Sequence, residues 1–138
     1  MVDREVLRTK LATLERCLAR ITEVRGPRRA SLTPLDVDDI TVINLQRAAQ
    51  AAIDVASHVV LSEGYGVPDS LSAPFELLER HGVLDTGLAW RLRKTSGLRT
   101  ITLHDRPSTE PALADALVTN RLGDFRAFAE RLMSRFGE

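Results

Sequence analysis

The chain has 138 residues, of which 43% are apolar and 28% are charged, and this composition is typical of a globular protein with a packed core. Its length suits one domain, spanning residues 1–138. The 19 basic and 19 acidic residues leave no formal net charge, so any site for nucleic acid has to be local rather than a property of the whole surface.

The cysteine count and the hydropathy exclude several classes of protein. The single cysteine, Cys17, excludes an internal disulfide and a zinc site built from cysteines, which fits a reducing compartment. No run of 18 apolar residues is present to span a membrane, and charges from the third residue onward exclude the apolar core of a secretion signal. We therefore expect a cytoplasmic protein without membrane contact.

The first predicted helix covers residues 3–25. Apolar side chains recur there at spacings of four, three, four and three, which places them on one stripe of a helix. The members of this stripe are Leu7, Leu11, Leu14, Leu18 and Ile21. A Gly-Pro pair ends the helix, and residues 28–37 are expected to be a linker because Pro34 is unfavourable in a helix interior.

A second, longer helix is predicted for residues 38–63. Its apolar positions surround most of its circumference, a pattern typical of a central helix that is packed on several sides. Its alanines would allow neighbouring helices to approach closely. These apolar positions are Ile43, Leu45, Ala48, Ala49, Ala52, Ile53, Ala56, Val59 and Val60.

The second half of the chain predicts two short helices and a third long one. The short helices cover residues 72–80 and 85–95, and the long helix covers about 112–136. Three of the four phenylalanines lie in the last helix, where we expect them in the core rather than as platforms for stacked bases. Residues 101–103 have β propensity, but no other segment offers a strand to pair with them. We predict an all-α bundle of three long helices with two short helices inserted.

The three histidines are the first candidates for chemistry. No two of them lie at the short spacing of local metal ligands, and His58 is expected to be a structural residue of its helix. His81 precedes a glycine at the end of a short helix, where the helix dipole favours an imidazolium, so a role in ending that helix is favoured. His104 differs because Arg99 lies five residues before it and Arg106 lies two residues after it.

Arg99 and His104 can cooperate only if a bend or a second copy of the chain brings them together. Five residues of an ideal helix turn by about 500°, so the two side chains would point about 140° apart. Spacing alone therefore favours an ordinary solvated helix start. If the two side chains do meet, a histidine can move a proton at neutral pH and a guanidinium can bind a phosphate. Such a pair suffices for metal-free RNA cleavage by the 2′-OH.

The remaining motifs indicate neither a metal nor a cofactor. The aspartates at 36, 38 and 39 suit the start of a helix. The GYG stretch at 64–66 lacks the strand and helix that flank a phosphate-binding loop. Arg93 and Lys94, together with Arg91, could form a basic patch beside Arg99, although ordinary solvated charge explains these residues as well.

Four stretches of the chain resemble, in their order, the HepT family of the HEPN superfamily. They are NLQRAAQAAIDVASHVV (44–60), GVPDS (66–70), FELLERHGVLD (75–85) and GLRTITLHD (97–105), within a resemblance that runs from about residue 38 to 132. The resemblance implies an all-α ribonuclease toxin of a prokaryotic toxin–antitoxin pair. It also implies a homodimer that brings the motifs of both chains to one cleft, and a partner antitoxin with a minimal (MNT-type) nucleotidyltransferase domain.

The family motif is an arginine, four residues, a histidine, any residue and a tyrosine. Arg99 and His104 match the first two, which implies a phosphate-binding role for Arg99 and general acid/base catalysis by His104. Thr100 stands where the family usually has asparagine, and Arg106 replaces the tyrosine to which some antitoxins attach AMP. Arg106 cannot take that modification, but it adds a positive charge for RNA phosphate, as do Arg93 and Lys94.

These departures leave other functions open beside that of an active ribonuclease. A degenerate HEPN module could pair with a nucleotidyltransferase without cutting RNA, and the changes at Thr100 and Arg106 favour that alternative. A dimeric helical scaffold without any nucleic-acid role is a third possibility. It predicts no RNA binding even at low salt, where electrostatic contacts are strongest.

Overall fold

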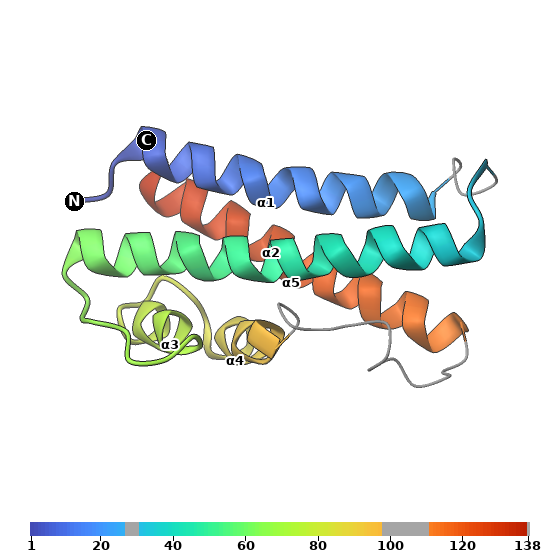
Figure 1. Cartoon of the computed structure of the whole chain (residues 1–138). Helices are drawn as coiled ribbons and strands as arrows, with labels where there is room; N and C mark the ends of the chain where they lie inside the picture. Colours follow the sequence, from blue (N-terminus) through green and yellow to red (C-terminus); the bar gives the residue numbers. More distant parts are fainter. Residues whose placement is uncertain (27–30, 98–110, 138) are drawn as a thin grey trace.

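The computed structural model describes residues 1–26, 31–97 and 111–137. Within these ranges the chain forms five helices and no strand (Figure 1): α1 (Arg4–Arg25), α2 (Pro34–Glu63), α3 (Ala73–Arg80), α4 (Thr86–Thr95) and α5 (Pro111–Phe136). The predicted all-α class, and the order of three long and two short helices, are confirmed. No helix in the described ranges is long and apolar enough to cross a membrane.

Helix α1 begins at a side-chain cap and buries the predicted apolar stripe. The carboxylate of Asp3 accepts hydrogen bonds from the backbone N–H groups of Glu5 and Val6 at 3.0 and 3.2 Å, which satisfies two of the donors left free at a helix start. The five apolar residues of the stripe are at most 3% exposed. The spacing of apolar residues therefore identified the face of α1 that packs on the core.

Helix α2 begins four residues earlier than predicted. Pro34 is its first residue, where a missing N–H costs nothing, and not an interior residue of the helix. Thr33 caps the helix: its Oγ1 accepts from the N–H of Asp36 at 3.0 Å, and its own N–H donates to the Asp36 carboxylate at 3.4 Å. This reciprocal capping box extends α2 through residues 34–37, which were expected to belong to a linker.

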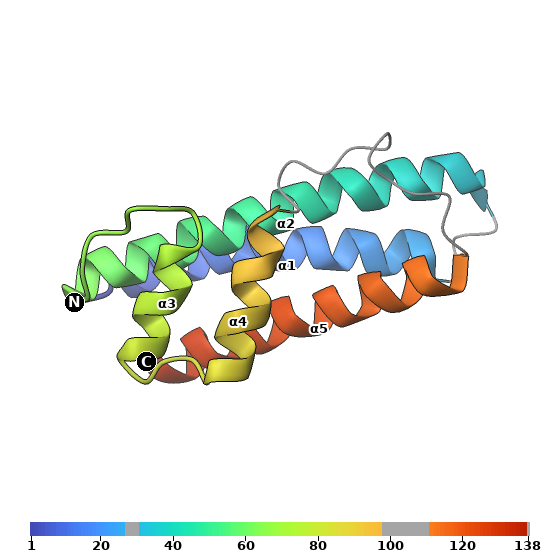
Figure 2. The same ribbon diagram turned by 90° about the horizontal axis from the view of Figure 1, so that it is seen from below.

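The long helices lie roughly parallel or antiparallel to one another, and the short ones cross them (Figures 1 and 2). Helix α1 packs along α2, and α5 contacts α1. Helices α3 and α4 lie side by side, α3 against α2 and α4 against α5. Both chain ends lie at the same end of the bundle, where an Arg8 Nη2 group donates to the carbonyl oxygen of Gly137 at 2.7 Å.

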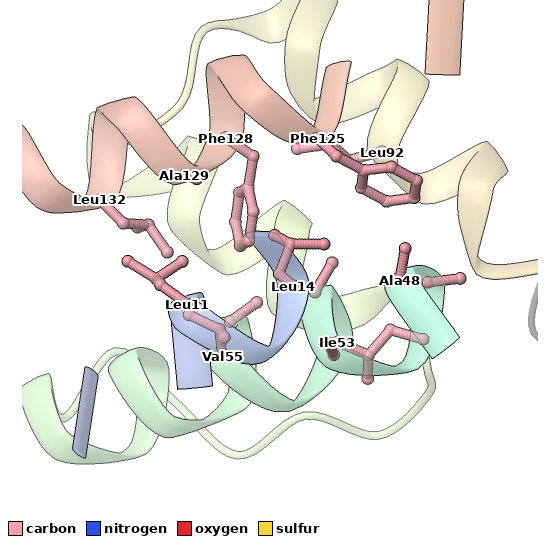
Figure 3. Close-up of a cluster of buried hydrophobic side chains, with 14 of the residues drawn as sticks. Leu11, Leu14, Ala48, Ile53, Val55, Leu92, Phe125, Phe128, Ala129 and Leu132 are labelled. Carbon is pink, nitrogen blue, oxygen red and sulfur yellow. The ribbon is translucent and has the colours of Figure 1, made fainter. Parts of the chain in front are cut away.

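The core is formed where these helices meet (Figure 3). Phe128 of α5 contacts Phe75 of α3 edge to face, with ring centroids 5.7 Å apart. Leu14 of α1 and Leu92 of α4 are fully buried in the same cluster. Of the nine predicted apolar positions of α2, eight are buried; the prediction was wrong for Ile43, which is 44% exposed.

Candidate functional site

The Arg/His motif lies between α4 and α5. Arg99, Thr100, His104 and Arg106 all fall outside the described residues. The described chain provides the two helices that flank this segment along the sequence, α4 before it and α5 after it. The part of the chain that the structure describes next to this segment in the sequence is therefore α4 and α5.

Helix α4 carries two of the three predicted RNA-binding residues, Arg93 and Lys94, and their side chains contact different neighbours. Its start is fixed by Asp85, whose carboxylate accepts from the N–H of Leu88 at 2.8 Å. Arg93 faces α3, where its Nη1 group donates to the Glu76 carboxylate at 3.0 Å. Lys94 faces solvent and places its ammonium 3.8 Å from the ring centroid of Trp90. The charged groups of Arg93 and Lys94 thus contact different neighbours.

A buried carboxylate joins α4 to α5. Asp124 is only 8% exposed, and one of its oxygens accepts from Nε of Arg91 at 2.8 Å. Its other oxygen lies 3.7 Å from Nη1 of Arg121. Within the described residues, the buried Nε of Arg121 has no hydrogen-bond acceptor. Two guanidinium groups thus share one carboxylate, which leaves the cluster with a net positive charge.

The contacts of Asp124, Arg121 and Trp90 were not predicted from the sequence. An acidic residue directly before Phe125, on the buried side of a predicted helix, is a signal that could have identified Asp124, because a buried carboxylate requires a partner. No comparable signal in the sequence identifies Arg91 of α4 as the partner of Asp124, because tertiary packing determines which arginine reaches this carboxylate. Trp90 stands out only in the structure, where its side chain is half exposed.

The other two histidines are structural residues. His81 is the C-cap residue of α3, as expected, and its Nδ1 lies 2.9 Å from the carbonyl oxygen of Leu77, where it donates. Its ring stacks on Tyr65 with centroids 4.0 Å apart. His58 is partly buried in α2, and its Nε2 has no hydrogen-bond partner within the described part of the chain.

A groove between α1 and α2 contains the single cysteine but no reactive group. Its volume is about 310 Å³, and it is lined by Lys10, Thr13, Cys17, Arg47, Gln50, Ala51 and Asp54. Burial raises the pKa of the Cys17 thiol, which disfavours the nucleophilic thiolate. Across residues 1–26, 31–97 and 111–137, no group of histidine, cysteine and carboxylate side chains is placed to bind a metal ion.

Comparison with known proteins gives one consistent family. Residues 13–132 match the family model described as Ribonuclease HepT-like. Over 126 residues the chain is 31% identical to the mRNA nuclease HepT of Shewanella oneidensis, and the match covers 91% of this chain and 95% of the relative.

Solved structures agree with this result. A tri-AMPylated Shewanella oneidensis HEPN toxin in complex with MNT antitoxin superposes with a TM-score of 0.79 at 30% identity, covering 97% of this chain and 99% of that one. A mutant MntA-HpeT toxin–antitoxin gives a TM-score of 0.82 at 30% identity, covering 94% of this chain and 98% of that one. The family model, the sequence relative and the folds therefore place this chain in the HepT-like ribonuclease family.

Proposed function

We propose that this protein is the toxin of a prokaryotic toxin–antitoxin pair and an endoribonuclease that needs no metal ion. The observation that carries the proposal is that the match to an mRNA nuclease covers 95% of that relative, while this chain keeps an arginine and a histidine at the family spacing. Residues 1–138 would form one HepT-like domain that acts in the cytoplasm. Because the match covers almost all of both proteins, it supports assigning the nuclease activity named for the relative to this chain as a whole.

The proposed reaction uses the 2′-OH of RNA as the nucleophile. A neutral His104 takes the proton of the 2′-OH, and the 2′-oxygen attacks the adjacent phosphorus. The bond from phosphorus to the 5′-oxygen breaks, and a protonated histidine gives a proton to that leaving oxygen. The products are a 2′,3′-cyclic phosphate and a 5′-OH end. Arg99 stabilises the negative charge that gathers on the phosphoryl oxygens in the transition state.

Two chains are expected to build one cleft. In a homodimer, His104 of one copy can act as the base while His104 of the other acts as the acid. Arg99 of one copy can also lie beside His104 of the other, although the two side chains point apart within one helix. A two-fold axis brings identical segments of the two chains together in such a dimer. The proposed protein partner is an antitoxin with a nucleotidyltransferase domain, by analogy with the HEPN toxin solved in complex with MNT antitoxin.

Two residues of the motif favour a second candidate function. Arginine has no phenolic oxygen, so AMP cannot be attached at position 106 as it would be to a tyrosine there. Thr100 replaces an asparagine amide with a shorter hydroxyl, which provides fewer hydrogen bonds. A HEPN module with these changes could bind a nucleotidyltransferase and RNA without cleaving RNA.

Cleavage of a mixed tRNA and mRNA substrate in the presence of EDTA tests the proposal. We expect the wild type to cleave the RNA and leave cyclic-phosphate ends, and we expect His104→Ala to lose cleavage while its helical circular dichroism is unchanged. His81→Ala is the matched control, since His81 ends α3 and should leave cleavage intact. Cleavage by His104→Ala at the wild-type rate would refute the assignment, and a folded wild type without activity would favour the binding module.

A further inference from the structure

Trp90 is the only tryptophan of the chain, and the core does not use it. It is 50% exposed on α4, whose buried side consists of Leu88, Ala89, Leu92 and Thr95. Half of the Trp90 surface stays in water and forgoes the gain from burial, so packing within this chain explains only part of its position. The ring is therefore available as a contact surface for a ligand.

The surroundings of this ring are cationic. Lys94, one helical turn further along α4, holds its ammonium 3.8 Å from the ring centroid. Arg91 lies next to Trp90 in the sequence and meets Arg121 of α5 at the shared Asp124 carboxylate. The contacting parts of α4 and α5 therefore carry three cationic side chains and one carboxylate, that of Asp124. We refer to Trp90, Lys94, Arg91 and Arg121 as the α4–α5 patch.

This combination has the chemistry of a contact for single-stranded nucleic acid. Proteins that bind single strands stack bases on aromatic side chains and hold the phosphates with lysine and arginine. Duplex RNA keeps its bases stacked inside the helix, so an exposed ring can stack only with an unpaired base. A protein partner is the poorer fit, because the centres of protein interfaces are depleted of charge whereas this ring is bordered by cations.

We propose that Trp90 is a stacking platform for an unpaired base of single-stranded RNA, with the cations of the α4–α5 patch contacting the neighbouring phosphates. This inference rests on the proposed function and deepens it by naming the form of RNA that is bound. Lys94 precedes Arg99 by five residues, and a chain of that length spans at most about 18 Å. RNA held at Trp90 is therefore within reach of the motif.

The single tryptophan makes the test direct, because fluorescence excited at the red edge of the absorption band, where tyrosine does not absorb, reports on Trp90 alone. Titrating His104→Ala protein with a short oligouridylate should quench this fluorescence, whereas a duplex RNA of the same length should not. In the same background, anisotropy of a labelled oligouridylate should show affinity about 10-fold weaker with Trp90→Ala, and largely restored with Trp90→Phe. Leu61→Ala, at an exposed apolar site on α2, is the matched control and should bind like the parent.

The outcomes separate this inference from the proposed nuclease activity. Quenching and a Trp90-dependent affinity, combined with a wild type that does not cleave, would support the platform while refuting the nuclease. Tight binding without quenching, equal in Trp90→Ala, would overturn the platform and leave the nuclease intact. The platform is also overturned if oligouridylate does not bind, or if Trp90→Ala keeps its affinity for RNA but no longer co-purifies with the co-expressed antitoxin.

Discussion

Asp124 joins α4 to α5 through an ion pair with Arg91. Its side chain is 11% exposed, and its carboxylate neutralises part of the charge of Arg91 and Arg121. We expect Asp124→Asn to lower the free energy of unfolding by about 2 kcal/mol, less than for a fully buried pair because the Arg91 side chain is 47% exposed. Urea denaturation followed by circular dichroism measures this change.

The exposed pair of Arg20 and Glu23 provides the control for that measurement. Both side chains are more than 40% exposed, so the attraction between them is screened by water. Arg20→Gln should change the free energy of unfolding by less than about 0.5 kcal/mol. Equal effects of Asp124→Asn and Arg20→Gln would show that the Asp124 cluster contributes no more than a surface pair.

Residue-level patterns predicted only part of the site. The spacing of Arg99 and His104 was recognisable in the sequence through the family motif, and Lys94 was recognisable as a member of a basic run. The ring contact of Lys94 and the pairing of Arg93 with Glu76 were not, because both depend on the direction in which α4 presents each side chain. The Asp124 cluster joins residues 33 positions apart in the sequence, which no local pattern connects.

At the scale of the helix, the start of α2 offers a clean test of local structure. Thr33→Ala removes the hydroxyl that caps Asp36 N–H, and we expect a loss of about 1 kcal/mol in the free energy of unfolding. Thr33→Ser keeps a hydroxyl in the same place and should stay within a few tenths of a kcal/mol of the wild type. Thermal unfolding of the three proteins measures the difference. If serine and alanine at position 33 are equally stable, the cap contributes nothing.

The same helix shows why element identity is easier to predict than element boundaries. Apolar periodicity extends over many residues, so it identified the long helices and the buried stripe of α1. The start of α2 depends on three residues only: the cap Thr33, the proline after it and Asp36. Pro34 is unfavourable inside a helix and favourable at its first position, and the expectation of a linker followed from the first property alone.

The architecture of the whole molecule separates the chain ends from the start of α5. The N- and C-terminal residues lie at one end of the bundle, and α5 begins at the other end (Figures 1 and 2). An affinity tag fused to the N-terminus is therefore placed away from the start of α5. This arrangement makes it practical to label two copies of the chain differently and to purify a mixed dimer.

A mixed dimer tests whether the two chains share one cleft. Wild-type and His104→Ala chains carrying different N-terminal tags are co-expressed and purified through both tags in turn, and a dimer of two differently tagged wild-type chains is the control. If one histidine takes the proton and the partner's histidine gives it, the mixed dimer lacks half of the machinery and should retain less than about a tenth of the control activity. Two independent sites would instead leave about half, because one intact motif remains. Activity near half, or a chain that sediments as a monomer, would refute the shared cleft.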